Sequence, residues 1–324
     1  MGLPVGLIPG YFLGDGSLRS TVSGGLIGLL ISFGMVLFEV SWGVGLIPRR
    51  WREARFIVIL ITRSLAYMTI IVVGLSLPLV LVERVPAREL LSVSIATSAL
   101  IGFAIALVIN FIGQVNRLLG RGVLISLITG RYHRPREEVR MFLLIDLKGS
   151  SRIAEELGNL RYHAFLKRFI DDISVAAVRY GGDIHRYVGD EVILTWTEQR
   201  GLHDAASVRC MLALEEAFAA AADRYLDEFG VAPMTWAGLH LGPVVTGDIG
   251  TFKHEIVHIG DTLNVAARIE QACREFDRSF LASANVVDAM QLPDDVQIER
   301  LGPIELRGIG RSVELLALSR DTLD

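Results

Sequence analysis

Hydrophobic positions are distributed unevenly along this chain. Up to residue 112 the sequence consists of long, nearly continuous apolar runs, whereas beyond residue 140 short apolar segments alternate with polar ones. A helix needs about 20 apolar residues to cross a bilayer, and the runs at 22–47, 56–82 and 90–112 reach that length. Buried helices of soluble proteins rarely continue this far without a polar face. The pattern therefore predicts a membrane domain over residues 1–113 with three spans.

Charged residues between the predicted spans indicate their orientation. The first connection carries Arg49, Arg50, Arg52 and Arg55, so the positive-inside rule places it in the cytoplasm. The third span then exits on the same side, which makes the C-terminal half a cytoplasmic domain of a multi-pass protein in a bacterial-type inner membrane. Residues 1–13 are apolar but too short to cross alone. We expect either an interfacial or re-entrant segment there, or the end of a further span.

Two ionisable residues, Glu39 and Arg63, fall inside the predicted spans. An unpaired charge at such a position costs about 2.5–3.5 kcal/mol on insertion scales. Counted from the arginines of the first connection, both lie at a similar depth, because a helix rises about 1.5 Å per residue. We therefore predict a charge pair within one chain or across a dimer. The alternative is that each side chain separately reaches the membrane surface.

The segment 114–139 is a basic junction between the two halves. It contains a run of arginines and the helix-stopping Pro135. It is either a linker held near anionic lipid or an element that transmits a signal by setting how two cytoplasmic domains meet. We expect the folded cytoplasmic domain over 140–319, followed by a short tail at 320–324.

Composition supports this division of the 324-residue chain. Hydrophobic residues make up 51%, and the mean hydropathy of +0.45 is too apolar for a soluble enzyme of this size. From 141 onward there are 18 Lys and Arg against 29 Asp and Glu. The overall net charge of −4 is therefore the sum of a basic junction and an acidic C-terminal domain. The cysteines Cys210 and Cys273 have no Cys-x-x-C spacing, which indicates a reduced compartment and no zinc site.

Two carboxylates follow predicted strands in the C-terminal half. Asp146 ends the apolar strand pattern 141–145 and precedes a Gly/Ser turn and a predicted helix, an arrangement that suits a cation and a phosphate. Asp190 lies at the Gly-Asp tip of a predicted hairpin formed by 183–188 and 191–196. Either residue could serve turn chemistry alone. Together, on adjacent strands, two carboxylates would form a Mg²⁺ site for a polyphosphate.

Further along, Asn264 and Arg268 are four residues apart on a predicted helix and share one face. An amide and a guanidinium on one face suit a phosphate and sugar ligand, although a solvated face has the same composition. Upstream of this helix, the segments 235–241 and 244–248 have strand patterns on either side of Gly242-Pro243.

Other motifs can be set aside. His254 and His258 form an H-E-x-x-H sequence, but the surrounding β-branched residues and glycines favour a strand. Residues four apart on a strand are about 13 Å apart, which is too far for one zinc ion. The sequence has neither a Walker A motif nor a GGDEF box.

Five ordered blocks of the C-terminal half resemble the catalytic domain of class III adenylyl/guanylyl cyclases, over about residues 140–318. They are FLLIDLKGSS, GGDIHRYVGDEVILTW, GLHLGPVVTGDIG, IGDTLNVAARIE and ELRGIG. The resemblance implies a fold class in which an α-helical transmembrane region is followed by an α/β (α+β) ferredoxin-like palm. It also implies a head-to-tail homodimer in which a monomer is inactive.

The resemblance assigns roles to individual residues. Asp146 and Asp190, with the Leu147 carbonyl, would bind two Mg²⁺ or Mn²⁺ ions; Asn264 would orient the ribose, and Arg268 would stabilise the pentavalent phosphorus. The other implied nucleotide contacts are Lys148, Gly149, Ser150, Ser151, Gly189 and Arg307, the last at the terminal phosphates. The metal pair and the Asn264 helix would come from different protomers. Nucleic acid and zinc are not expected as partners.

The sequence departs from the family at the base-reading pair. Arg186 stands where adenylyl members often have Lys, and Val257 stands where they often have Asp or Thr. Arg186 can donate to adenine N1 or guanine O6, whereas Val257 cannot accept a proton from the adenine amino group. We predict an adenylyl cyclase acting on ATP. The alternatives are a guanylyl or mixed-specificity cyclase and a non-catalytic, cyclase-like membrane receptor.

Overall fold

The computed structural model describes residues 18–44, 55–82, 84, 86, 93–119, 125–126, 129–251 and 254–320. The chain divides into two compact units, 1–119 and 120–324. The expectation for residues 1–13 lies outside the described residues.

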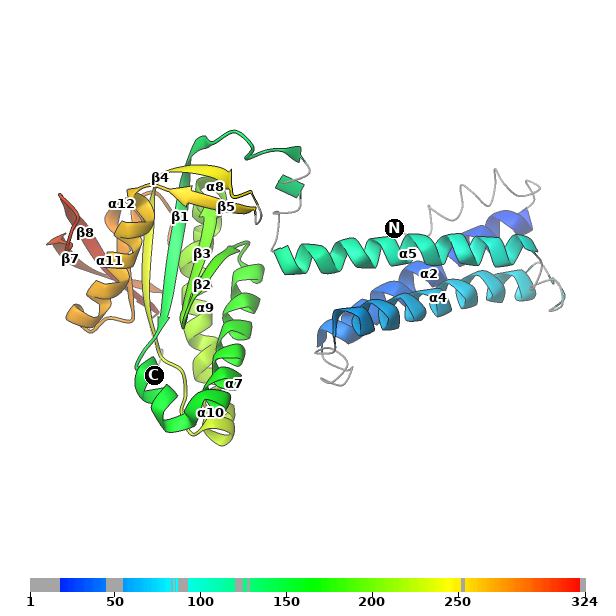
Figure 1. Ribbon diagram of the computed structural model, residues 1–324, viewed down its shortest axis with the longest axis horizontal. Helices are drawn as coiled ribbons and strands as arrows, with labels where there is room; N and C mark the ends of the chain where they lie inside the picture. The colour runs from blue at the N-terminus through cyan, green and yellow to red at the C-terminus, as the bar shows by residue number, and fades with distance from the viewer. Residues whose placement is uncertain are drawn as a thin grey trace. The chain divides into compact units, whose positions relative to one another are not determined.

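The described part of the first unit forms the helices α2 (Leu18–Val44), α4 (Phe56–Leu81) and α5 (Val93–Leu119) (Figure 1). Residues Thr21–Trp42 and Phe56–Leu81 have mean hydropathies of 2.0 and 2.3, so α2 and α4 are long and apolar enough to cross a membrane. Within α5 the apolar stretch is shorter, Leu100–Asn116. The third span therefore stays a prediction.

Glu39 on α2 and Arg63 on α4 lie together within one chain. The Arg63 guanidinium and the Tyr67 hydroxyl both donate hydrogen bonds to Glu39 Oε1. The guanidinium also lies 5.2 Å from the ring centroid of Trp42. The Arg63 side chain is 6% exposed and that of Glu39 is 42% exposed. The buried cation therefore has an anionic and an aromatic partner.

Reversing both charges of this pair should restore what either single reversal removes. Glu39→Arg or Arg63→Glu places two like charges in contact, and each unpaired charge costs about 2.5–3.5 kcal/mol in the apolar phase. We expect each single variant to give less folded chain in the membrane fraction, and the double variant to approach the parent amount. A double variant no better than the two singles would contradict the pairing.

The second unit is an eight-stranded sheet covered by helices on both faces. Strand order is β2-β3-β1-β4-β6-β8-β7, and β5 pairs with β4. The strands are β1 (Arg136–Leu147), β2 (Asp183–Val188), β3 (Glu191–Thr197), β4 (Thr235–Ile249), β5 (Glu255–Ile259), β6 (Phe280–Ser283), β7 (Val296–Glu305) and β8 (Ser312–Arg320). Its described helices are α7 (Ser150–Arg179), α8 (Glu198–Leu202), the 3-10 turn η2 (His203–Ala205), α9 (Ala206–Ala220), α10 (Ala222–Phe229), α11 (Asp261–Phe276) and α12 (Ala284–Val287).

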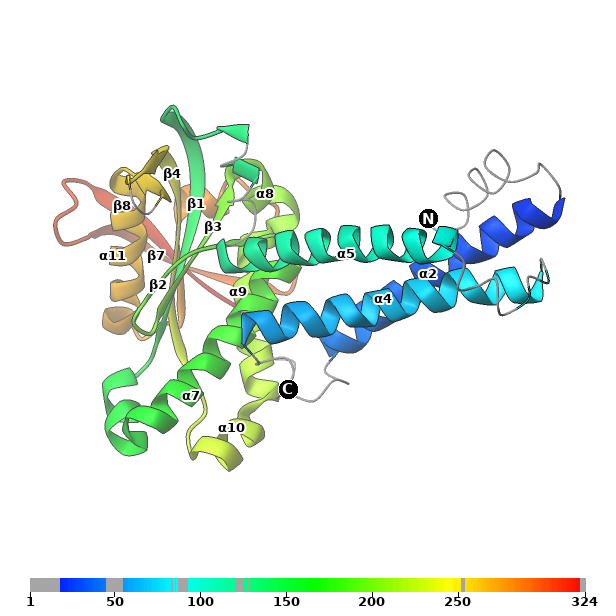
Figure 2. The same cartoon turned by 45° about the vertical axis from the view of Figure 1, so that its right-hand side comes forward.

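Strand alternation divides the core between the two faces of the sheet. In β1, Met141, Leu143 and Ile145 pack with α7 and α9, whereas Phe142 and Leu144 pack against residues of α11. Figures 1 and 2 show α7, α9 and α10 on one face and α11 on the other. This mixed α/β sheet confirms the predicted fold class. The thiols of Cys210 on α9 and Cys273 on α11 are free and buried on opposite faces.

One sequence prediction is corrected in this sheet. The segments 235–241 and 244–248 are not two strands but the single strand β4, which runs through Gly242 and Pro243. Pro243 pairs with Val139 of β1. On its other edge β4 pairs with β6 up to Leu239 and with β5 from Val245. The proline thus lies in the interval between two partner strands, where it interrupts neither ladder.

The close approach of α11 to β4 depends on Gly238. A Cβ atom at this position would lie 2.4 Å from the Glu270 backbone nitrogen and 2.6 Å from the Ala266 carbonyl oxygen. Both are backbone atoms of α11, so relief would require a shift of the whole helix.

Gly238→Ala should therefore destabilise this unit. Overpacking of this kind typically costs about 1–3 kcal/mol, and we expect a fall in Tm of about 5 °C in thermal unfolding of the solubilised chain. Gly310→Ala is the matched control, because a Cβ there meets no atom within 4 Å. Equal Tm values for the two variants would contradict the tight contact.

Candidate functional site

Asp146 and Asp190 meet at one end of the central strands. The antiparallel pairing of β1 with β3 places Ile145 opposite Val192, which brings the end of β1 to the β2–β3 turn. In that turn Gly189 has φ 67°, a left-handed conformation that favours glycine. The Asp190 carboxylate is the largest neighbouring charge that acts on Asp146. The structure thus places together the two residues expected to bind metal.

The charges around this carboxyl pair are only partly balanced. Burial and the neighbouring Asp190 carboxylate raise the pKa of Asp146, while Arg274 on α11 opposes this rise. Arg274 Nη2 lies 2.5 Å from Asp146 Oδ2 and 3.6 Å from Glu270 Oε1. The pKa values of Glu191 and Glu270 are both raised to about 7. The main cause is burial, and Asp146 is the neighbouring charge with the largest effect on each. The site holds a surplus of negative charge.

This donor set fits a divalent cation of the Mg²⁺ or Mn²⁺ type. Hard cations prefer carboxylate and carbonyl oxygens, and Mg²⁺ is usually held by one or two carboxylates with phosphate and water completing its shell. In the part of the chain that the structure describes, no group of three or more His, Cys, Asp and Glu side chains is arranged to hold a metal. The pair with the Leu147 carbonyl would leave positions open for a nucleotide's phosphates.

The turn that follows Asp146 is held in a fixed shape. The Lys148 backbone N–H donates to the Met234 carbonyl at 2.8 Å, and its ammonium lies 4.0 Å from the Trp236 ring centroid. Gly149 has φ 73° and precedes Ser150 and Ser151, the first residues of α7. Ser150 hydrogen-bonds to Tyr162, whose pKa is raised by burial and by Asp190 and Asp146. Tyr162 therefore lies near the carboxyl pair.

Asn264, Arg268 and Arg307 line a separate groove of about 340 Å³. Its other lining residues are Asp261, Ala267, Gln271, Gly308 and Ile309. Arg268 Nη1 donates to Gln271 Oε1 at 2.6 Å. Arg268 and Arg307 give the groove two positive charges. Neither Asp146 nor Asp190 lines it. The structure thus gathers these three residues, but in one protomer it does not bring them into one pocket with the carboxyl pair.

Arg186 and Val257 lie on β2 and β5. Arg186 Nη2 donates to Glu255 Oε1 at 2.5 Å, so its partner is an acidic residue two positions before Val257. Val257 pairs with Gly247 in the ladder between β4 and β5. Sequence reasoning missed Glu255, Glu191, Glu270 and Arg274. Two signals in the sequence could have indicated some of these residues. Glu191 directly follows Asp190. Glu270 and Arg274 have the i, i+4 spacing of a helical ion pair.

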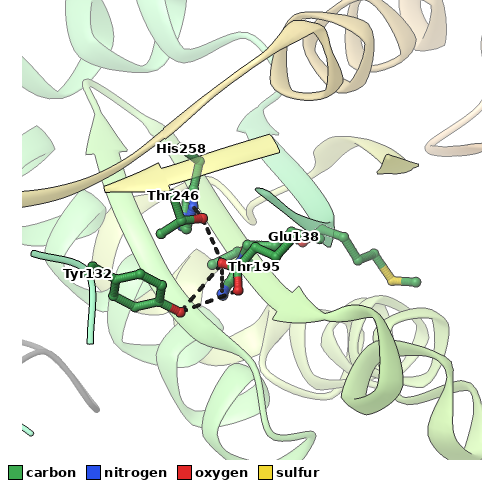
Figure 3. A network of polar contacts seen from close by, with 7 residues as sticks. Tyr132, Glu138, Thr195, Thr246 and His258 are labelled. Atoms are coloured by element: carbon green, nitrogen blue, oxygen red, sulfur yellow. Dashed lines mark hydrogen bonds and ion pairs between the residues drawn. The ribbon is translucent and has the colours of Figure 1, made fainter. Parts of the chain in front are cut away.

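A polar network joins the start of the folded unit to β5 (Figure 3). Thr246 Oγ1 donates to Glu138 Oε1 at 2.6 Å and lies 2.8 Å from His258 Nδ1. The Tyr132 hydroxyl lies 3.4 Å from the Glu138 carboxylate. The same His258 ring also lies 4.8 Å from the ring of His185, measured between centroids. Burial lowers the pKa of His185 to about 4 and that of His258 to about 3.

Protonation of His185 and His258 should lower the free energy of unfolding between about pH 6.5 and pH 4, whereas Glu191 and Glu270, whose pKa is raised to about 7, shift it in the opposite direction. In the unfolded chain both histidines titrate near pH 6.5, whereas in the folded chain they stay neutral down to about pH 4. At these two histidines the unfolded state binds protons first, so their contribution to the free energy of unfolding falls as the pH drops through this window. By pH 5 we expect a loss of about 1–2 kcal/mol per histidine.

Thermal unfolding of the solubilised chain at pH 7.5 and pH 5.0 measures this effect. His185→Phe, which keeps an aromatic ring next to Phe142, should make the change in Tm from pH 7.5 to pH 5.0 more positive than it is in the parent chain, because one of the two buried histidines is removed. The same change in Tm as in the parent chain would show that His185 does not contribute to the pH dependence.

Comparisons with known proteins show similarity to one group. No protein-family model matches the chain. It is 39% identical over 238 residues to adenylate cyclase 2 of Rhizobium meliloti (strain 1021), which covers 74% of this chain and 63% of that protein. It is 24% identical over 183 residues to the adenylate cyclase of Anabaena cylindrica, covering 53% and 35% respectively. The chain thus spans less than two thirds of each of these relatives.

Solved structures show the same fold at lower identity. A bacterial light-regulated adenylyl cyclase aligns with TM-score 0.56 and 20% identity, covering 68% of this chain and 66% of that one. The adenylyl cyclase CyaB from P. aeruginosa aligns with TM-score 0.52 and 21% identity, covering 59% of this chain and all of that one. The sheet with Asp146 and Asp190 therefore has the fold of these catalytic domains.

Proposed function

We propose that this chain is a membrane-anchored adenylate cyclase of the class III adenylyl/guanylyl cyclase family. It converts ATP into 3′,5′-cyclic AMP and pyrophosphate. The observation that carries this proposal is the meeting of Asp146 and Asp190 at the end of β1, in a site with surplus negative charge. The 39% identity to an adenylate cyclase supports ATP as the substrate.

In the proposed reaction the ribose 3′-oxygen attacks the α-phosphorus in line. A bond forms between these atoms, the bond from the α-phosphorus to the bridging oxygen breaks, pyrophosphate leaves, and the hydroxyl proton passes to solvent. Two bound divalent cations would lower the pKa of the 3′-hydroxyl and stabilise charge on the phosphate oxygens. Asp146, Asp190 and the Leu147 carbonyl would hold them. The carboxylates need no nucleophilic role.

The groove on α11 supplies the other half of the proposed site. Asn264 would orient the ribose, Arg268 would stabilise charge at the reacting phosphorus, and Arg307 would bind the terminal phosphates. Because this groove and the carboxyl pair are separate within one protomer, we propose a homodimer in which each active site takes the carboxyl pair from one protomer and the groove from its partner.

The apolar helices support the anchoring part of the proposal. Two of them are long and apolar enough to cross a bilayer, and Arg55 lies immediately before α4. We propose that this end of the bundle faces the cytoplasm, where ATP is available to the second unit. The inner membrane is the proposed location.

Product analysis tests this proposal directly. The solubilised full chain, supplied with Mn²⁺, is given ATP and GTP separately, with Asp190→Ala as the blank. Cyclic AMP above the blank is the expected result. Cyclic GMP in its place would assign a guanylyl cyclase, which Arg186 permits because a guanidinium can donate to guanine O6. Nucleotide binding without either product would favour a non-catalytic receptor.

A further inference from the structure

Arg274 contacts Asp146 in a way that the reaction described above does not use. Its Nη2 atom lies 2.5 Å from Asp146 Oδ2 and 3.6 Å from Glu270 Oε1. The Arg274 side chain is 57% exposed, whereas the side chains of Asp146 and Glu270 are 14% and 4% exposed. A partly exposed cation therefore lies between two largely buried carboxylates.

The contact with Asp146 competes with the binding of a metal ion. A carboxylate oxygen that accepts a hydrogen bond from a guanidinium has fewer lone pairs to offer a cation, and two positive charges on one carboxylate repel each other. Lys148 is engaged elsewhere, because its ammonium lies 4.0 Å from the Trp236 ring centroid and 4.0 Å from Asp277 Oδ1. A divalent cation at Asp146 would therefore displace the Arg274 guanidinium from Oδ2.

Glu270 offers the displaced guanidinium a second position. In the part of the chain that the structure describes, its Oε1 atom is buried and accepts no hydrogen bond, and a buried carboxylate oxygen without a donor is unfavourable. An N–H···O hydrogen bond has a donor–acceptor distance of about 2.9 Å. Nη2 of Arg274 lies 3.6 Å from this oxygen, so a shift of less than about 1 Å would complete the bond.

We propose that Arg274 is a positioning residue that competes with a divalent cation for Asp146 and moves to Glu270 when the cation binds. This inference rests on the proposed function, which assigns Asp146 to the cation. Arg274 balances the charge of Asp146 before the cation arrives and thereby lowers the affinity of the site for it. Glu270 limits that loss, because it receives the guanidinium.

Equilibrium binding of Mn²⁺ to the solubilised full chain at pH 8.0 tests the competition without turnover. The electron paramagnetic resonance signal of free Mn²⁺ gives the dissociation constant, which, unlike the amount bound, does not depend on the folded fraction. We expect Arg274→Gln to bind Mn²⁺ about 3- to 10-fold more tightly than the parent chain, a range that allows for solvent screening of a partly exposed cation.

Two controls show whether this effect comes from the contact with Asp146. Arg278→Gln removes the same charge four residues further on, where Arg278 forms an exposed ion pair with Glu299 at 2.8 Å. It should bind Mn²⁺ as the parent chain does. In chains that carry Asp146→Ala, Arg274→Gln should leave Mn²⁺ binding unchanged. A change of equal size with or without Asp146 would contradict the competition.

A double-mutant cycle tests the role of Glu270. While Arg274 is present, Glu270→Gln should weaken Mn²⁺ binding by about 3-fold, because the displaced guanidinium loses its charged partner. In the Arg274→Gln chain the same change should have a smaller effect. If Glu270 acted only by attracting the cation, its removal would matter at least as much there, since no guanidinium would offset its charge. That result would overturn the exchange.

These binding measurements separate the inference from the proposed function. Mn²⁺ binding by Arg274→Gln that is no tighter than in the parent chain would overturn the inference even if the parent forms cyclic AMP. Tighter binding, with the larger Glu270 effect in chains that keep Arg274, would support it even if no cyclic nucleotide forms. A complete lack of Mn²⁺ binding in all of the chains would also overturn it, because the competition needs a cation at Asp146.

Discussion

Replacing Asp190 by alanine should lower the kcat for cyclic AMP formation by about 1,000-fold or more. Bound cations contribute several kcal/mol of transition-state stabilisation, and each 1.36 kcal/mol corresponds to a tenfold change in rate. Asp146→Ala should have the same effect, because the two carboxylates are neighbouring charges and would hold the same cations. The measurement is product formation from ATP by the solubilised chain with Mn²⁺.

A carboxylate elsewhere on the surface controls for loss of charge. Asp288→Ala removes an exposed partner of Arg300 and should leave kcat unchanged. Asp190→Ala retaining more than about a tenth of the parent activity would contradict a metal-binding role, since losing a ligand should cost more than one tenfold step.

Mixing two inactive variants should restore activity if each site is shared between protomers. Asp146→Ala disables the carboxyl half and Asn264→Ala disables the groove half, so a dimer with one of each contains one intact site. Random pairing makes half of the dimers mixed, and each has one working site of two, so coexpression should give about a quarter of the parent activity. Cyclic AMP formation by the copurified chains measures this.

The matched control for complementation is the mixture of Asp146→Ala with Asp190→Ala. Both changes lie in the carboxyl half, so every dimer that forms lacks an intact site and the mixture should stay inactive. No activity in the Asp146→Ala and Asn264→Ala mixture would argue for sites contained within single protomers. Restored activity in the control would mean instead that the two carboxylates of one site come from different protomers.

The fold was predictable where the pattern is local. The contrast between long apolar runs and alternating segments separates the two units, and a carboxylate at the end of a buried strand marks Asp146. The hairpin tip at Gly189-Asp190 is also a local signal, because only a few residue types fit a tight turn. These features depend on neighbours in the sequence.

The features that escaped prediction depend on contacts between distant segments. Pro243 indicated a break, yet β4 continues through it because the gap between β6 and β5 falls at that position. Arg274 meets Asp146 across 128 residues, and Arg186 meets Glu255 across 69. Such pairs follow from how α11 and β5 pack on the sheet, which no local pattern records.

The two cysteines of the chain are both fully buried, Cys210 in α9 and Cys273 in α11. Burial raises the pKa of each thiol to about 12, so neither forms the reactive thiolate at neutral pH. A cysteine introduced at an exposed position such as Asp171, whose side chain is 65% exposed, would be the thiol that a maleimide dye labels in the native protein. Energy transfer between two dyes could then follow the association of protomers in a lipid vesicle with every native cysteine left in place.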